Sequence, residues 1–323
     1  MPSLIDPLHR TPLAVVDVET TGASPRWGDR VIEIGIVRYE QGTPVARYEA
    51  LVDPRRPISA GVTVLTGISQ TMVAGQPTFG DRLGEILPLL SGAVLVGHNV
   101  RFDIAFLIGE LRRCRLSLNE ALSSAPKAPA APAGFSESLF PAVDGGAGMP
   151  VSLPDRPAAA PHVLDTVRLA RRRFGRGGNA LQRLSRRFGI VPPVAHRALA
   201  DAETTGMVLE HLLEPLGGFD AMLVDVMQAQ GGAMRLDKLQ AEPEPLPMEI
   251  FDAIEAGRPV KMIYLDREAR RTERVITPIR IRRRRGTAAL IAHCQLRDEQ
   301  RTFKLDRIVT LEPLEAPVGR VAG

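Results

Sequence analysis

Two carboxylates one residue apart end an apolar run near the start of the chain, at Asp17 and Glu19 in LAVVDVETTG, residues 13–22. Side chains alternate along a strand, so these two acids project from the same face. Two unpaired like charges beside an apolar core would cost several kcal/mol, and either a divalent cation between them or protonation would offset that cost. The alternative is a strand end whose acids are simply solvated.

Two later segments carry groups of the same kind. Asp103, in GHNVRFD, falls in the first turn of an expected helix, where the helix dipole by itself favours an acid. His196 and Asp201 stand about one helical turn apart in AHRALADAETT, residues 195–205. Carboxylates suit hard cations such as Mg²⁺, and an imidazole with a pKa near neutrality suits proton transfer. Each signal is weak alone.

Together, VVDVETTG, GHNVRFD and AHRALADAETT resemble the three motifs of the DEDDh group of DnaQ-like 3'-5' exonucleases, which includes the proofreading epsilon subunit of bacterial replicative polymerase. The resemblance implies an α/β, RNase H-like fold, a mixed five-stranded sheet with helices on both faces. It also implies two Mg²⁺ or Mn²⁺ ions. Asp17 would bridge both, Glu19 and Asp201 would complete one shell, and Asp103 would bind mainly through water. His196 would be the general base.

The resemblance further implies a substrate and the residues that hold it. The substrate would be the 3' end of single-stranded or frayed nucleic acid, DNA favoured over RNA, and the products nucleoside 5'-monophosphates. Thr20 and Thr21 look like residues that hold the terminal nucleotide. Asn99 looks like a residue that contacts either the substrate or the coordination shell of the metals. Leu65 and Phe102 resemble apolar residues that wedge and stack bases, although ordinary core packing explains them equally well.

The elements that must position these residues follow from local patterns. Residues 13–20, 31–39 and 45–52 predict an antiparallel meander of strands, and residues 93–96 predict a short buried strand. Asn99 is a candidate N-cap for a helix over residues 100–113. Further helical patterns cover residues 62–68, 79–90, 165–174, 180–188 and 198–213. We expect an exonuclease domain at residues 1–215, with a flexible Ala/Pro-rich insertion at about residues 119–161.

A second domain is expected at residues 247–317, after a linker at residues 216–246. A short helix at 248–256 precedes alternating strands, which suggest a small barrel. VKMIYLD and RTFKLDRI are similar to the WYL domain, although Ile263 stands where the family's tryptophan would be. The resemblance implies a small Sm-like or SH3-like β-barrel that binds single-stranded nucleic acid or another ligand and regulates the attached activity.

Several residues of this second domain are candidates for ligand binding. Arg280, Arg282 and Arg284 alternate with isoleucines, which places their guanidinium groups on one side of a strand, where phosphates could meet them. A solvated barrel face is the equal alternative. The remaining ligand-pocket candidates, of which the first two also suit local packing, are Tyr264, His293, Arg301 and Arg307.

Composition limits the remaining possibilities. The 323-residue chain has a net charge of +4, which suits an anionic partner, but its abundant arginine also fits a GC-rich genome. Cys114 and Cys294 form no paired-ligand spacing, which predicts a reducing, cytoplasmic compartment. We expect no signal peptide and no membrane partner. Two alternatives to a free-standing exonuclease are a non-catalytic nucleic-acid clamp and a proofreading subunit with a polymerase or repair partner.

Overall fold

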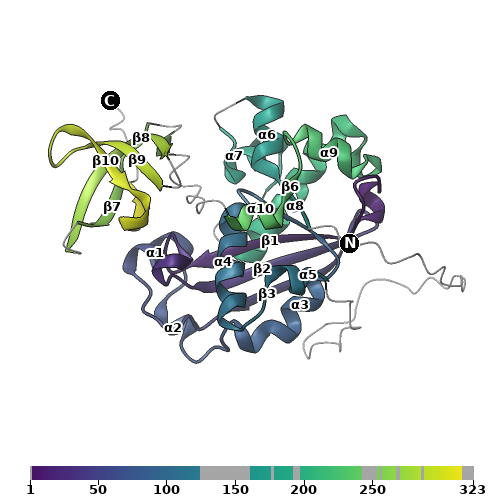
Figure 1. Ribbon diagram of the computed structural model, residues 1–323, viewed down its shortest axis with the longest axis horizontal. Helices are drawn as coiled ribbons and strands as arrows, with labels where there is room; N and C mark the ends of the chain where they lie inside the picture. The colour runs from purple at the N-terminus through teal and green to yellow at the C-terminus, as the bar shows by residue number, and fades with distance from the viewer. Residues whose placement is uncertain are drawn as a thin grey trace, which may run out of the picture.

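The computed structural model describes residues 2–123, 161–175, 178–191, 197–241, 253–254, 257–266, 270–284 and 287–314. These residues form two separate sheets (Figure 1). Within these ranges, none of the helices combines the length and the apolar character needed to cross a bilayer.

The first sheet is mixed and has the order β3-β2-β1-β4-β5-β6. Antiparallel pairs join β1 to β2, β2 to β3 and β5 to β6, whereas β1–β4 and β4–β5 are parallel. The bounds are β1 (Leu13–Thr20), β2 (Val31–Glu40), β3 (Thr43–Leu51), β4 (Val94–Gly97), β5 (His162–Asp165) and β6 (Met234–Arg235).

Helices cover both faces of this sheet, as predicted (Figure 1). One face packs against α3 (Leu83–Leu90), α4 (Arg101–Arg113) and α5 (Leu118–Ser123). The other packs against α6 (Thr166–Phe174), α7 (Leu181–Phe188), α8 (Ala198–Leu213) and α9 (Leu223–Ala229). The remaining elements of this part are η1 (Leu8–Arg10), η2 (Pro25–Trp27), α1 (Ala60–Thr66), α2 (Gln70–Val73), η3 (Gly80–Arg82), η4 (Glu214–Leu216), η5 (Gly218–Asp220) and α10 (Leu236–Ala241).

Strand β1 is apolar on both sides because it lies in the interior of the sheet. Ala14, Val16 and Val18 belong to the core under α3, α4 and α5, while Leu13 and Val15 belong to the core under α6 to α9. The alternation of side chains continues past this core, so Asp17 and Glu19 point to the α8 side.

A glycine lets α8 approach the sheet closely beside these acids. Gly35 of β2 is the register partner of Asp17. A Cβ added to Gly35 would overlap the backbone of Ala198 and Leu199 at the start of α8. The absent side chain therefore allows the first turn of α8 to lie directly against β2, next to Asp17.

The structure corrects several predicted boundaries. The sheet has six strands rather than five, because β6 pairs with β5 at its edge. Residues 118–123 form α5 rather than the start of the insertion; the rest of the predicted insertion, up to residue 160, lies outside the described residues. β5 was missed, since only four residues carry its pattern and it depends on pairing with β4 for hydrogen bonds.

The predicted linker at residues 216–246 also begins too early. Leu223, Val226 and Met227 of α9 are buried in the first domain, as are Met234 and Leu236. The apolar side chains of this segment therefore complete the core of the first domain up to α10. The rest of the predicted linker, residues 242–246, lies outside the described ranges.

The second sheet is antiparallel, in the order β10-β9-β8-β7-β11. Its elements are β7 (Val260–Leu265), β8 (Arg271–Arg284), β9 (Thr287–Cys294), β10 (Glu299–Lys304), η6 (Leu305–Arg307) and β11 (Ile308–Pro313). Val260, Met262, Ile276, Leu290 and Phe303 belong to its separate apolar core. Among the described residues no pairing joins β10 to β11, so barrel closure stays a prediction. Of the predicted helix at residues 248–256, only residues 253–254 are described, and they are helical.

Candidate active site

Three carboxylates meet where the end of β1 faces the first turn of α8. Asp17, Glu19 and Asp201 each have a side-chain oxygen within 4.8 Å of the others. Asp201 is buried and the other two are half-buried. Oxygens that share one Mg²⁺ or Ca²⁺ lie at most about 4–5 Å apart, because each is about 2.0–2.6 Å from the ion. This group therefore fits a single hard divalent cation.

Asp103 lies on the first turn of α4 and is not one of these three carboxylates. Its carboxylate accepts the backbone N–H of Val18 at 3.1 Å, and the residue is only 4% exposed. Burial raises the pKa of Asp103 well above its ordinary value, and the negative charge of Asp165 raises it further. A cation next to Asp103 would favour the charged form of this acid. Asp103 thus joins the first turn of α4 to the end of β1.

Asp165, which sequence reasoning missed, connects the starts of two helices. It is the N-cap of α6, where its carboxylate accepts the N–H of Val167 at 3.0 Å. The same oxygen accepts the N–H of Asn99 at 3.1 Å. An acid immediately before a helical pattern is an N-cap signal, so LDTVRLA could have identified Asp165. This carboxylate ties the segment that leads into α4, and hence Asp103, to β5.

Asn99 adopts a left-handed conformation with φ of 65°. The prediction that Asn99 is the N-cap of α4 is wrong, because the helix begins at Arg101 and Val100 occupies the cap position. The turn at Asn99 is needed to redirect the chain from β4 into α4.

His98, next to Asn99, is buried on the α6 side. Its Nδ1 and the Thr166 hydroxyl lie 2.8 Å apart, and that hydroxyl donates to the Gly97 carbonyl at 3.2 Å. Burial lowers the pKa of His98 to about 4, so the imidazole is neutral near pH 7. His98 therefore serves as a packed connection between β4 and α6.

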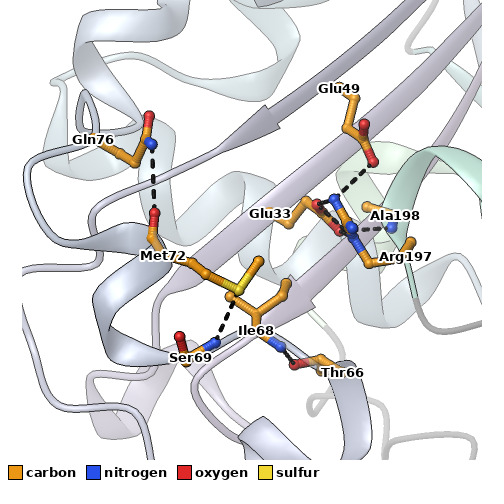
Figure 2. Close-up of polar contacts among 9 residues, drawn as sticks. All are labelled: Glu33, Glu49, Thr66, Ile68, Ser69, Met72, Gln76, Arg197 and Ala198. Carbon is orange, nitrogen blue, oxygen red and sulfur yellow. Dashed lines mark hydrogen bonds and ion pairs between the residues drawn. The ribbon is translucent and has the colours of Figure 1, made fainter.

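A buried ion pair fixes the start of α8 (Figure 2). Glu33 has 0% exposure and accepts bonds from Arg197, at 2.9 Å from Nε and 2.6 Å from Nη2. Glu33 also accepts the N–H of Ala198 at 2.9 Å, and Arg197 reaches Glu49 at 3.2 Å. Bonding to Glu33 raises the pKa of Arg197, and the charges of Glu33, Glu49 and Glu19 add to it.

Sequence reasoning missed this pair, although a signal was present. Glu33 is an acid within the apolar strand VIEIGIV, and such an acid requires a partner. Glu33 is also the register partner of Glu19. The ion pair therefore joins the strand beside Glu19 to the helix that carries Asp201. His196, the predicted general base, lies outside the described residues, so its role stays a prediction.

The predicted substrate contacts are placed as follows. The Thr20 hydroxyl donates to the Gly22 carbonyl at 2.7 Å, and the Thr21 hydroxyl lies 3.2 Å from Asp29 Oδ1, so both bond within the turn after β1. Phe102 packs against the core and against Phe106, with ring centroids 4.9 Å apart. Leu65 is a half-buried residue of α1. Contact with substrate remains a prediction for all of them.

In the second sheet, Arg280 and Arg282 are exposed and two residues apart on β8. The side chain of Arg284 lies outside the described set. His293 Nε2 lies 3.1 Å from Asp298 on the surface, and Arg301 lies 3.6 Å from Glu299.

Tyr264 packs edge-on against Phe303, with ring centroids 5.2 Å apart. Its hydroxyl accepts the Lys304 N–H at 3.3 Å. Tyr264 thus contributes to the local packing of the second sheet, and Arg307 is a half-buried residue of η6. A ligand role for these residues stays a prediction.

Comparisons with known proteins agree with this arrangement. Residues 14–124 match the RNase T family model, described as Exonuclease, and residues 246–313 match the WYL domain. The chain is 34% identical over 210 residues to 3'-5' exonuclease DinG of Bacillus subtilis, which covers 65% of this chain and 18% of that protein. It is 32% identical over 239 residues to a DNA polymerase III subunit epsilon-like protein of Rhodobacter capsulatus, and this match covers 71% of this chain and 28% of that protein.

The chain thus spans less than a third of the length of these curated relatives. Among solved structures, a zinc-bound E. coli ExoI complex with single-stranded DNA superposes with a TM-score of 0.50 at 14% identity, covering 87% of this chain and 54% of that one. At this identity the likeness shows the fold alone. Residues 14–124 therefore form a DnaQ-like exonuclease domain of the RNase T family, and a C-terminal WYL domain follows at residues 246–313.

Proposed function

We propose that this protein is a metal-dependent 3'-5' exonuclease that removes nucleoside 5'-monophosphates from the 3' end of single-stranded or frayed nucleic acid, DNA in preference to RNA. The observation that carries the proposal is the convergence of Asp17, Glu19 and Asp201 within 4.8 Å in a DnaQ-like domain. The relative named 3'-5' exonuclease DinG supports the direction of cleavage.

The carboxylates of Asp17, Glu19 and Asp201 are the type of ligand that the metals of this chemistry need, and their spacing suits one ion. Asp17, Glu19 and Asp201 would hold one Mg²⁺ or Mn²⁺, and Asp17 with Asp103 would hold a second, Asp103 mainly through water. When bound, two such ions stabilise the charge that develops on the attacking and leaving oxygens of a phosphodiester. His196 would take the proton of the attacking water. The Glu33–Arg197 pair holds the start of α8, four residues before Asp201, and Arg197 directly follows His196 in the sequence.

The WYL domain would bind nucleic acid or another ligand and regulate the nuclease. The exposed Arg280 and Arg282 on β8 support this role, because guanidinium groups bind phosphates well. The finer expectation for this domain is a closed Sm-like or SH3-like barrel.

A polymerase or repair partner is a second candidate for the cellular role. It is favoured by similarity to the epsilon-like protein and by 31% identity over 238 residues to DNA polymerase III PolC-type of Latilactobacillus sakei. A non-catalytic clamp is disfavoured, because a clamp gains nothing from a group of carboxylates that repels phosphate.

The direct test is degradation of 3'-labelled and 5'-labelled single-stranded DNA and RNA by the full chain with Mg²⁺ or Mn²⁺. We expect stepwise release of mononucleotides from the 3' end. Asp17→Ala should lower the rate at least about a thousandfold, since a metal site supplies several kcal/mol of transition-state stabilisation. The fold should persist, because the substitution also removes charge repulsion. Binding without cleavage in either metal would favour the clamp.

A further inference from the structure

The helical pair α6–α7 carries a concentrated positive charge. Between Asp165 and Asp201 the sequence contains nine arginines and no aspartate or glutamate, whereas the chain's average acid content would place about four acids in such a span. A GC-rich genome raises the arginine count but does not remove acids. Five of these arginines are exposed on the two helices and form what we call the arginine surface: Arg172, Arg173, Arg183, Arg186 and Arg187.

The arginine surface is not neutralised by neighbouring acids. Across the described ranges, none of its five side chains forms an ion pair with a carboxylate. Arg173 donates to the carbonyl of His211 at 2.6 Å, and Arg186 donates to the carbonyl of Gln182 at 3.0 Å. Glu214 lies next to this surface, and its carboxylate is 2.7 Å from Nδ1 of His211. The guanidinium charges of this surface therefore face solvent.

Aromatic rings hold two of these guanidinium groups in place. The guanidinium carbon of Arg187 lies 3.8 Å from the centroid of the Phe174 ring, and that of Arg173 lies 5.1 Å from it. Phe174 in turn packs against Phe188, which stacks on His211 with centroids 4.8 Å apart. A guanidinium that contacts a ring through its face keeps its in-plane N–H groups for an anion. Both arginines are thus positioned without being neutralised.

The arginine surface and the acidic group are connected through α8. Helices α6, α7 and α8 pack together on one face of the sheet (Figure 1). Asp201 is in the first turn of α8, and His211, which contacts the arginine surface, follows ten residues later, about 15 Å along the helix. Phosphates of one stacked strand repeat about every 3.4 Å, so this distance corresponds to about four nucleotides.

From these observations we infer that the arginine surface binds the sugar-phosphate backbone of nucleic acid, several nucleotides away from a 3' end held at Asp17, Glu19 and Asp201. The inference rests on the proposed exonuclease function. Its consequence is that the enzyme binds a long strand at two places, and a strand of four nucleotides at the acidic group alone.

The test compares two charge-matched double variants. Arg172→Gln with Arg183→Gln removes one arginine from each helix of the arginine surface, and neither residue stacks on Phe174. Arg112→Gln with Arg115→Gln removes two exposed arginines at the end of α4, on the opposite face of the sheet. Binding of fluorescent 20-nucleotide and 4-nucleotide single-stranded DNA is measured by anisotropy in EDTA from 50 to 200 mM salt, and hydrolysis of both is measured with Mg²⁺.

For the Arg172/Arg183 variant we expect about tenfold weaker binding of the 20-nucleotide strand and a salt slope lower by about 1.4, since each lost single-strand phosphate contact contributes about 0.7. Hydrolysis of the 4-nucleotide strand should not change, and the Arg112/Arg115 variant should match wild type. Equal losses in both variants, or equal losses on both strands, would overturn the inference. The inference would also be overturned if the Arg172/Arg183 variant bound both oligonucleotides as wild type does but sedimented less with phosphatidylserine vesicles. The arginine surface would then bind anionic lipid rather than nucleic acid. If wild type cleaves neither strand, the exonuclease proposal fails, while the binding measured in EDTA still decides the role of this surface.

Discussion

Gly35 of β2 is the register partner of Asp17, and the backbone of Ala198 packs directly against it. A single strand position thus sets the distance between β1, which carries Asp17 and Glu19, and α8, which carries Asp201. Because the contact is between main chains, neither side can yield by a change of rotamer.

Gly35→Ala should therefore damage both stability and activity. The added methyl group overlaps the first turn of α8, and overpacking of this kind costs about 1–3 kcal/mol in the free energy of unfolding. Displacement of Asp201 should also lower the hydrolysis rate at least about a hundredfold. Urea denaturation and the nuclease assay measure the two effects. Gly84→Ala is the control, because open space surrounds Gly84 within α3, and it should stabilise by about 0.5–1 kcal/mol. Wild-type activity in Gly35→Ala would refute this account of how α8 is placed.

Arg197→Ala should destabilise the protein by about 3 kcal/mol, because it leaves the fully buried Glu33 without its cation. Adding Glu33→Gln to this variant should recover part of the loss, since the buried charge is then gone. The matched control is Arg47→Ala, which breaks an exposed pair with Glu203 and should cost less than about 1 kcal/mol. Chemical denaturation of the three variants and of the wild type gives the comparison. Similar losses in the two arginine variants would contradict the buried-pair argument.

His98 should make stability depend on pH in the acidic range. Burial lowers its pKa to about 4 in the folded protein, whereas an unfolded histidine titrates near 6.5. The unfolded chain therefore takes up a proton first as the pH falls, so stability decreases between about pH 6.5 and pH 4, by up to about 3 kcal/mol. His98→Gln should flatten this part of the stability curve measured by urea denaturation. His9→Gln, at a half-buried histidine, is the control for the substitution itself, and a curve unaffected by His98→Gln would exclude His98 as the cause.

Divalent metal should stabilise the folded protein through the acidic group. Binding only to the folded state raises its stability by about 2.7 kcal/mol at a hundred times the dissociation constant, which corresponds to a rise in Tm of several degrees. Asp201→Asn should raise the Tm in EDTA, because a negative charge is removed from the group, and should reduce the further rise with Mg²⁺. Thermal unfolding with Mg²⁺, against NaCl of equal ionic strength, measures both effects. The same Mg²⁺ response in wild type and Asp201→Asn would place the ion elsewhere.

The sequence by itself determined the features that depend on neighbouring residues. The apolar run before Asp17, the meander of β1 to β3 and the helical periods of α4 and α8 are local patterns, and each formed where it was predicted. The three motifs, each continuous in sequence, likewise identified the exonuclease domain, and VKMIYLD with RTFKLDRI identified the WYL domain.

Only the tertiary structure decided which distant groups meet. The four-residue β5 and two-residue β6 exist through pairing with other strands, and the predicted linker supplied core residues that its loop-like composition concealed. Glu33 and Arg197 are 164 residues apart in the sequence. Gly35 is separated by almost as many residues from the start of α8, which packs directly against it. Such contacts depend on shape, burial and close approach of main chains, and no periodicity along the chain encodes them.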